Sequence, residues 1–302
     1  MTRVALCALL LAPVWVEHPA RAQSTGPPGD VGQITDAFKN LVRAAYAQDT
    51  PGQLAICVGP EYFDSQCRSG PVTAAPGLSA LNSGAPYTWP DYDLSFGGLE
   101  AHVYGDIAYA VCPMPPIVRG SVDEDADQAC LAAILLRRDG AWKCRCTLEI
   151  EAWSPDRALG ADTRELLDQQ RDALRSTLYH YFDTMADGSP ITWLRFIHVH
   201  PSVPLLYFFP GGNEPPRLYA RDDFQPRPDV LAPVPTVRLA DPRNEFVLAG
   251  LRVALVAADV DVSIDGQPTR RMRWVAALWD GNLPGQWGVD VALHSAVPND
   301  KR

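Results

Sequence analysis

The sequence has no excess of basic residues, because its 26 Lys and Arg are outnumbered by 36 Asp and Glu, which gives a formal net charge of −10. This balance argues against a nucleic-acid partner, which would require a basic surface. Long hydrophobic runs are also missing after the N-terminus. The most apolar later stretch, residues 246–260, carries Arg252 and Asp259, so we expect no membrane-spanning segment.

Cysteine is absent from residues 147–302, although the chain has 7 in total. Six cysteines follow Cys7, an even number: Cys57, Cys67, Cys112, Cys130, Cys144 and Cys146. An even number in an exported chain indicates disulfides. The spacing of Cys144 and Cys146 is not that of paired CxxC zinc knuckles. We therefore expect no metal and no cofactor.

The N-terminus has the pattern of a signal peptide over residues 1–22. Arg3 is followed by an apolar run over 4–16, and Ala20-Arg21-Ala22 is a cleavage site of the A-x-A type. The run is shorter than the roughly 20 residues that span a bilayer. The sequence thus predicts a mature start at Gln23 and a periplasmic or secreted protein.

Two landmarks recur at one offset, which predicts a tandem duplication. Gly105 and Gly250 are 145 residues apart, and so are Trp142 and Trp287. We place a flexible lead at 23–29, a first domain with disulfides at 30–153, a linker at 154–161 and a second domain at 162–298.

Hydrophobic periodicity predicts the same order of elements in each domain. The expected helices cover 30–45, with Asp30 as N-cap, then 53–63, 162–186 and a short piece at 191–196. The expected strands cover 99–112, 128–136, 142–153, 246–262, 269–279 and 287–294. Arg138-Asp139-Gly140 is a hairpin turn, and the ten prolines of 201–242 indicate loop and edge strand.

Strand alternation predicts where the cysteines lie. Residues 142, 144, 146, 148 and 150 (Trp, Cys, Cys, Leu, Ile) should share the face toward the helices. A hairpin centred near Val122 would place Cys112 opposite Cys130, which predicts one disulfide. The other pairings stay open: Cys57 or Cys67 could reach Cys144 and Cys146, or Cys57 could bond Cys67.

The landmarks Gly105-Asp106-Ile107-Ala108 and Asp139-Gly140-Ala141-Trp142 resemble those of the nuclear transport factor 2-like (NTF2-like) family, specifically its SnoaL-like members. The resemblance implies an α+β fold of two tandem cystatin-like cone domains, each a curved antiparallel sheet wrapped by helices around a pocket. The second copy departs at 250–253 (GLRV) and at the insertion 282–284 (NLP). The family includes isomerases, cyclases, dehydratases and binding modules, so the fold does not decide the function.

Candidate pocket residues are Tyr46, Tyr181, His198 and His200. His198 and His200 would share a strand face, a spacing suited to proton transfer or metal binding. We expect the other polar strand residues to be solvated, namely Asp259, Asp261, Arg271, Arg273, Asp290 and His294.

These patterns favour an exported module that binds a small molecule or a protein without turnover. The alternative is an isomerase or lyase with a proton-transfer site in the second cone. Because cone domains of this family pair through their sheets, we expect either a monomer with internal domain pairing or a sheet-mediated homodimer.

Overall fold

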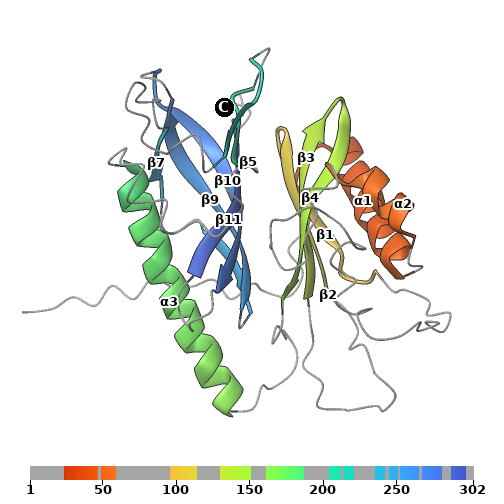
Figure 1. Ribbon diagram of the computed structural model, residues 1–302, viewed down its shortest axis with the longest axis horizontal. Coiled ribbons are helices and arrows are strands. Elements are labelled where there is room, and N and C mark those ends of the chain that lie inside the picture. Colours follow the sequence, from red (N-terminus) through yellow and green to blue (C-terminus); the bar gives the residue numbers. More distant parts are fainter. Residues whose placement is uncertain are drawn as a thin grey trace, which may run out of the picture.

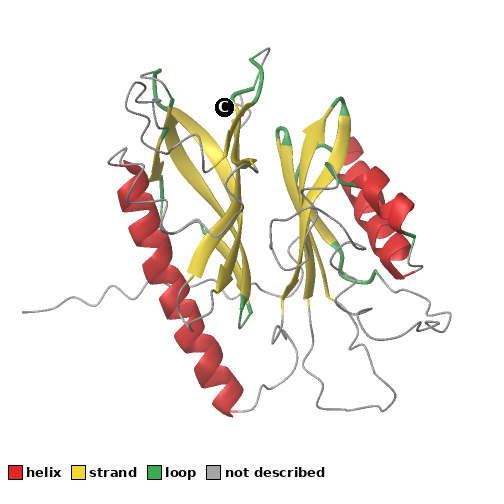
Figure 2. Cartoon of the chain, viewed as in Figure 1, coloured by secondary structure: helices red, strands yellow, loops and turns green. Residues whose placement is uncertain are grey.

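The computed structural model describes residues 24–46, 49–58, 96–113, 130–150, 161–186, 204–211, 214–220, 235–241, 245–250, 252–264, 267–280 and 287–296. They form a first unit, residues 24–150, and a second unit, residues 161–296. Each unit is a sheet with helices on one side only, as Figure 2 shows. The expected leader at 1–22 and linker at 154–161 lie outside the described residues.

The first unit has two helices and a four-stranded antiparallel sheet in the order β1-β2-β3-β4. Its elements are α1 (Pro28–Tyr46), α2 (Thr50–Ile56), β1 (Glu100–Tyr104), β2 (Ile107–Pro113), β3 (Cys130–Arg138) and β4 (Ala141–Ile150). The predicted strand 99–112 is therefore two strands, joined at Gly105, whose φ of 61° suits glycine. We call the face of this sheet that contacts α1 its helix face.

The apolar stripe of α1 packs on that helix face as its spacing predicts. Ile34, Phe38 and Leu41 are fully buried there. The N-terminus of the helix differs from the prediction, because α1 begins at Pro28. The carboxylate of Asp30 does not cap the helix but accepts hydrogen bonds from Arg137 at 2.7 Å and from the indole of Trp142 at 3.3 Å.

The lead and the hairpin turn have defined contacts. Thr25 forms a parallel bridge with His102, so the lead expected to be flexible pairs with β1. Asp139 and Gly140 have φ values of 53° and 78°. Both lie in the left-handed region that a two-residue hairpin turn requires, and this turn is where the sequence predicts it.

The second unit has one long helix and a seven-stranded sheet. Its elements are α3 (Ala161–Ala186), β5 (Pro204–Phe209), β6 (Arg217–Ala220), β7 (Thr236–Leu239), β8 (Phe246–Ala249), β9 (Val253–Ser263), β10 (Arg270–Asp280) and β11 (Trp287–Ala296). The order is β6-β5-β11-β10-β9-β7, with β8 also on β9. β5 pairs in parallel with β11. The proline-rich stretch thus contributes an interior strand as well as the edge strands β6 and β7.

Each sheet has a β-bulge near the middle of its last long strand. The pairing of β3 with β4 shifts at Arg145, and that of β10 with β11 shifts at Asp290. One extra residue reverses the side to which all later side chains point. The prediction of a single face for β4 is therefore wrong: Trp142 and Cys144 face the helices, while Cys146 faces away from them.

The hairpin of β2 and β3 is one residue out of the expected register. Cys112 lies opposite Leu131, and Pro113 lies opposite Cys130. Cys112 belongs to the helix-face cluster and Cys130 to the cluster on the other face. This register does not favour the Cys112–Cys130 disulfide, which stays a prediction. The structure holds the five described cysteines as thiols, and Cys67 lies outside the described residues.

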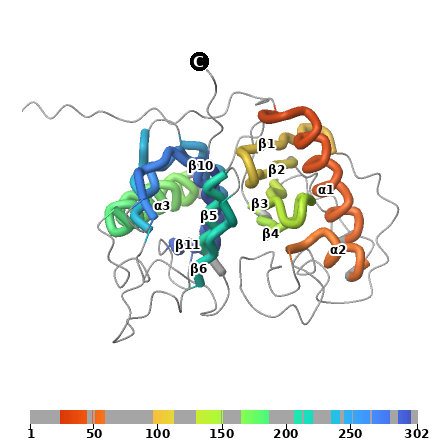
Figure 3. Tube along the Cα trace, turned by 90° about the horizontal axis from the view of Figure 1, so that it is seen from above, coloured from red at the N-terminus to blue at the C-terminus, as the bar shows by residue number. Residues whose placement is uncertain are grey.

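The two sheets pack against each other through the faces that carry no helix. We call these the inner faces. Figures 1 and 3 show the resulting layers, with α1 and α2 outside one sheet and α3 outside the other. One continuous apolar cluster spans both inner faces. The ring of Tyr109 stacks on Phe246 across the boundary at 5.2 Å. The interface is built like the core of a β-sandwich.

Polar groups also cross this boundary. The buried guanidinium of Arg145 donates to the hydroxyl of Tyr207 at 3.0 Å. Burial disfavours the charge of Arg145, but Tyr207, Cys146 and the opposing Asp290 raise its pKa above the ordinary value. The two bulges thus place charges of opposite sign between the sheets, which partly compensates the desolvation of each.

Candidate functional site

The strongest candidate site lies between α3 and the helix face of the second sheet. This face carries its own buried cluster, distinct from the inner-face cluster. Its members come from α3 and from five strands, β5, β8, β9, β10 and β11, with one further residue from β7. Three fully buried side chains in this region, Tyr181, Trp274 and His294, carry polar atoms.

His294 faces α3 because of the bulge at Asp290. Without that extra residue His294 would share a side with Gly288 and Asp290, away from Trp287, as strict alternation predicts. In the structure Trp274 lies opposite His294, and the Trp274 side chain belongs to the cluster under α3. The expectation that Asp290 and His294 are solvated is therefore wrong, since both are buried.

The polar atoms of this cluster have no hydrogen-bond partner among the described residues. They include the hydroxyl of Tyr181, the indole nitrogens of Trp274 and Trp287, and Nε2 of His294, which packs against the cluster through Phe208. The rings are close together: Tyr181 and Trp274 lie 6.1 Å apart, and His294 stacks on Phe208 at 4.0 Å. A buried polar group without a partner costs about 1–3 kcal/mol. Such groups in a native core therefore call for a functional explanation.

The chemistry of His294 follows from its contacts. Nδ1 lies 3.1 Å from the backbone carbonyl oxygen of Tyr207. That oxygen can only accept, so Nδ1 carries the proton and Nε2 presents a lone pair. Burial lowers the pKa of His294 to about 3, and the Tyr207 carbonyl opposes this shift. At neutral pH the imidazole is uncharged, and Nε2 can act only as a hydrogen-bond acceptor.

Glu245 brings an acidic group to the edge of the same region. It directly precedes β8, whose Phe246 is paired with Ala257, and so it comes level with Ala258 and Trp274. Burial raises the pKa of Glu245 to about 7, while the positive charge of Arg175 on α3 lowers it. A carboxyl group with this pKa can both accept and donate a proton near neutral pH.

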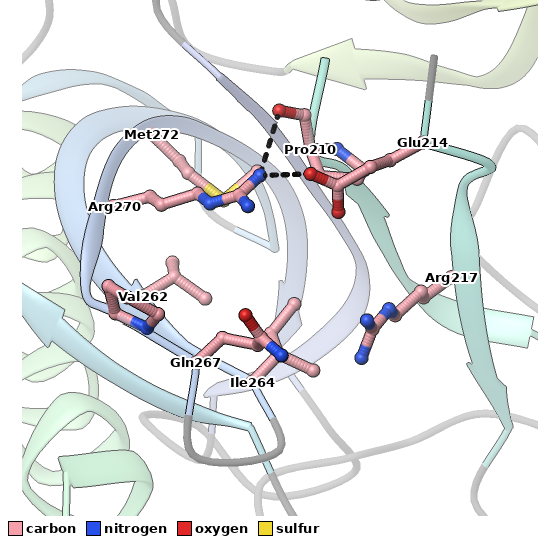
Figure 4. Close-up of a pocket in the computed structure, with 9 residues that line it drawn as sticks. Pro210, Glu214, Arg217, Val262, Ile264, Gln267, Arg270 and Met272 are labelled. Carbon is pink, nitrogen blue, oxygen red and sulfur yellow. Dashed lines mark hydrogen bonds and ion pairs between the residues drawn. The ribbon is translucent and has the colours of Figure 1, made fainter. Parts of the chain in front are cut away.

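A small pocket opens at the end of this face, as Figure 4 shows. Its floor is apolar and includes Val262, Ile264 and Met272. At its rim Arg270 donates to the carboxylate of Glu214 at 2.8 Å and to the carbonyl of Pro210 at 3.5 Å. The cavity volume is about 20 Å³, which is room for about one water molecule.

Met272, on the floor of the pocket, is two residues along β10 from Trp274, one of the residues with an unpartnered polar atom. Met272 is paired with Ala296, and Trp274, two residues further along the same face, is paired with His294. The Met272 side chain lies in the same cluster as Trp274.

The residues proposed from sequence have different outcomes. Tyr181 is fully buried in the candidate site. His198 and His200 lie outside the described residues. Tyr46 ends α1 of the first unit, and its side chain is also outside the described set. His294 and Glu245 were missed; the available signal was the adjacent apolar pair Ala292-Leu293, which is typical of a strand buried on both faces.

The two ion pairs on the extended ends of β9 and β10 differ in exposure: the Arg271 side chain is 54% exposed, as predicted for a solvated surface, whereas the Arg273 side chain is 11% exposed, so its predicted solvation is wrong. Arg271 binds Asp261 at 2.7 Å, and Arg273 binds Asp259 at 3.0 Å. In the part of the chain that the structure describes, no group of three or more His, Cys, Asp or Glu could hold a metal ion. No helix of that part is long and apolar enough to cross a membrane.

No family model matches the chain, and no curated protein matches it. Similar solved structures include an NTF2-like protein from Cytophaga hutchinsonii, which is 13% identical in sequence. The match covers 42% of this chain and 98% of that protein, with a TM-score of 0.31. A cystatin-like fold protein from Burkholderia xenovorans is 12% identical and covers 45% and 95%, with a TM-score of 0.28. A protein named as a candidate scytalone dehydratase from Novosphingobium aromaticivorans is 12% identical and covers 47% and 99%, with a TM-score of 0.31.

Proposed function

We propose that the protein is an exported small-molecule-binding module of two tandem NTF2-like units, and that it binds its ligand between α3 and the second sheet. One observation carries the proposal: Tyr181, Trp274 and His294 are fully buried between α3 and the sheet, and their polar atoms have no hydrogen-bond partner among the described residues. The ligand that fits is small, largely apolar and uncharged, with an acceptor for the two donors and a hydroxyl or amide donor for Nε2.

Binding without turnover is favoured by the basicity of His294. A general base acts best when its pKa lies near the working pH. The pKa of His294, lowered to about 3 by burial, suits a hydrogen-bond acceptor better than a proton acceptor. The inner faces cover each other, so they do not offer a surface for a protein partner.

The ligand proposal is tested by native mass spectrometry of protein purified without denaturation, with Tyr181→Phe as the key variant. We expect a retained small molecule on the unmodified chain and its loss from the variant. Because the removed hydroxyl has no hydrogen-bond partner in the part of the chain that the structure describes, Tyr181→Phe should leave the empty protein equally stable or more stable. Tyr109→Phe, on the inner face, is the matched control and should keep the ligand. No retained molecule, or one insensitive to Tyr181→Phe, would refute the proposal.

Export is tested separately by producing the full chain and measuring the mass of the mature product. We expect cleavage before Gln23 and recovery outside the cytoplasm. An uncleaved chain that stays in the cytoplasm would remove export from the proposal without affecting the ligand site.

A second candidate function, proton transfer in the same site, is favoured by Glu245. Its pKa of about 7, raised by burial, matches the requirement for an acid and base in one group. Incubation of the retained ligand with the protein in D2O distinguishes the two functions. Deuterium that enters the ligand with the unmodified chain, but not with Glu245→Gln, would indicate an enzyme. No exchange in either case supports binding alone.

A further inference from the structure

Cys57 and Cys144 lie directly opposite each other in the first unit. Cys57, just after α2, forms an isolated parallel bridge with Cys144 of β4, and the amide of Val58 donates to the carbonyl of Cys144 at 2.9 Å. Both side chains belong to the helix-face cluster, where they are 4% and 0% exposed. Residues paired in this way have Cα and Cβ atoms close enough for a disulfide.

Two further contacts hold the end of α2 against β4. The ammonium of Lys143 donates to the carbonyl of Ala55 at 2.6 Å, and Arg138 donates to the carbonyl of Val58 at 2.8 Å. Ala55 and Val58, two residues before and one residue after Cys57, are thus both bonded to the β3–β4 hairpin. The approach of Cys57 to Cys144 is therefore part of a continuous docked segment.

The other described cysteines do not compete for Cys144. Cys130 and Cys146 both point to the inner face. Cys146 does so although it is two residues from Cys144, because the bulge at Arg145 lies between them. Cys112 shares the helix face, but Cys144 is level with Ala108, four residues away along β2 and two strands across. That separation is roughly 13 Å along the strand and about 10 Å across, beyond the reach of a disulfide.

We propose that Cys57 and Cys144 form a disulfide that joins α2 to β4 in the mature protein. The proposal rests on the export part of the proposed function, because disulfides form and persist in oxidising compartments. The bond closes a loop of 88 residues, from 57 to 144 inclusive. Closing a long loop restricts the unfolded chain and thereby stabilises the first unit.

The oxidant required is a disulfide, supplied by a thiol oxidase protein or by oxidised glutathione. The thiolate of one cysteine attacks that disulfide to form a mixed disulfide, and the second thiolate then displaces the oxidant as a thiol or dithiol. Two thiol protons and two electrons leave the chain. Burial raises the pKa of Cys57 to about 12, which Lys143 partly opposes. The exchange therefore occurs before α2 docks on β4, while the thiols are accessible.

Peptide mapping of the alkylated, unreduced protein tests the pairing. Trypsin cuts after Lys143 and after Arg145, so Cys144 leaves in a dipeptide separate from Cys146. A second digestion, with a protease that cuts after glutamate, cleaves after Glu61 and separates Cys57 from Cys67. We expect the peptide with Cys57 to carry the Cys144-Arg145 dipeptide. A bond from Cys57 to Cys67, or alkylation of both Cys57 and Cys144, would overturn the proposal.

The map is made both on exported protein and on purified protein refolded with oxidised glutathione. A Cys57–Cys144 bond in the refolded sample alone would support the pairing and refute export, which separates the two failures. Cys144→Ala should lower Tm by about 5–15 °C under non-reducing conditions. Cys146→Ala, on the same strand but the other face, is the matched control and should respond to reductant like the unmodified chain.

Discussion

The two units share the geometry of their inner faces but differ in what lies under their helices. In the first unit α1 packs its own Phe38 and Leu41 on a sheet face that carries buried cysteines. In the second unit α3 covers aromatic residues whose polar atoms lack partners among the described residues. Both last strands nevertheless have a bulge, at Arg145 and at Asp290, 145 residues apart.

This difference separates the roles of the two regions. An interface between two sheets constrains register and bulge position, because a slip of one residue would exchange the buried and exposed sides. The space under each helix is not constrained by the other unit, so it can diverge. The ligand site that we propose lies in the second unit, and the disulfide that we propose lies in the first. Four predictions test this comparison.

The largest expected effect comes from removing the buried charge at the first bulge. Arg145→Ala leaves Asp290 and the hydroxyl of Tyr207 in a buried interface without the guanidinium. We expect a loss of about 3–5 kcal/mol in the free energy of unfolding, measured by urea denaturation. Arg252→Ala, on an exposed turn, is the control and should cost less than about 0.5 kcal/mol.

The double variant Arg145→Met with Asp290→Leu sharpens this test. Replacing both charges with apolar groups removes both desolvation costs, so it should recover most of the lost stability. A loss below about 1 kcal/mol for Arg145→Ala alone would show that the bulge charges do not organise the interface.

The second prediction concerns acid stability of the second unit. Unfolded histidine binds a proton below pH 6.5, whereas folded His294, with its pKa lowered to about 3 by burial, does not. The stability contributed by the neutral ring is present above pH 6.5 and is lost as the pH falls toward 3. Relative to His294→Phe, the unmodified chain should lose about 1.4 kcal/mol per pH unit across that window.

Urea denaturation at several pH values measures this difference. The two stability curves should run parallel above pH 6.5 and diverge below it. Parallel curves down to pH 4 would show that His294 is not buried as a neutral ring.

The third prediction compares two glycines with positive φ. A Cβ at Gly105 would lie 2.5 Å from Oγ of Ser295, which accepts from the amide of Asp106 across the interface at 3.1 Å. A Cβ at Gly140 would meet nothing within 4 Å. We expect Gly140→Ala to cost about 1 kcal/mol from backbone strain alone and Gly105→Ala to cost about 2–3 kcal/mol.

Thermal unfolding of the two alanine variants measures the contrast. Ser295→Ala should lessen the cost of Gly105→Ala and leave that of Gly140→Ala unchanged. Equal costs for both glycines would mean that the turn at Gly105 does not contact the second unit.

The smallest effect is expected for the ion pairs at the exposed ends of the strands. Arg271 is 54% exposed, whereas Arg273 is 11% exposed and stacks on the ring of Tyr104 of the first unit at 4.8 Å. Arg271→Gln should cost less than about 1 kcal/mol. Arg273→Gln should cost more, because it also removes a contact between the units. A larger loss for Arg271→Gln in urea denaturation would contradict this order.

Local patterns in the sequence were sufficient for most of the elements. The apolar stripe of α1, the turn at Asp139-Gly140 and the extent of α3 depend on residues within a few positions of one another. Pairing partners were harder to predict. The parallel contact of β5 with β11 joins residues far apart in the chain and leaves no local signal.

The candidate site could be predicted only in part, for a specific reason. Tyr181 lies on the buried stripe of a long helix, and helical periodicity locates it. His294 lies beyond a bulge, and a single extra residue at Asp290 reverses the predicted face of every residue after it. Because side chains alternate along a strand with a period of two, one extra residue is enough to assign every later side chain to the wrong face.

By itself, the sequence determined the long helices α1 and α3, most of the positions of the long strands and the hairpin turn, because short-range sterics and hydrophobic periodicity set these features; it misplaced α2, expected at 53–63, and merged β8 with β9. Only the tertiary structure decided which strands are buried on both faces, where the bulges fall, and that Cys57 lies opposite Cys144. These depend on the packing of one sheet against the other and of α2 against β4, contacts between residues that are distant in the chain.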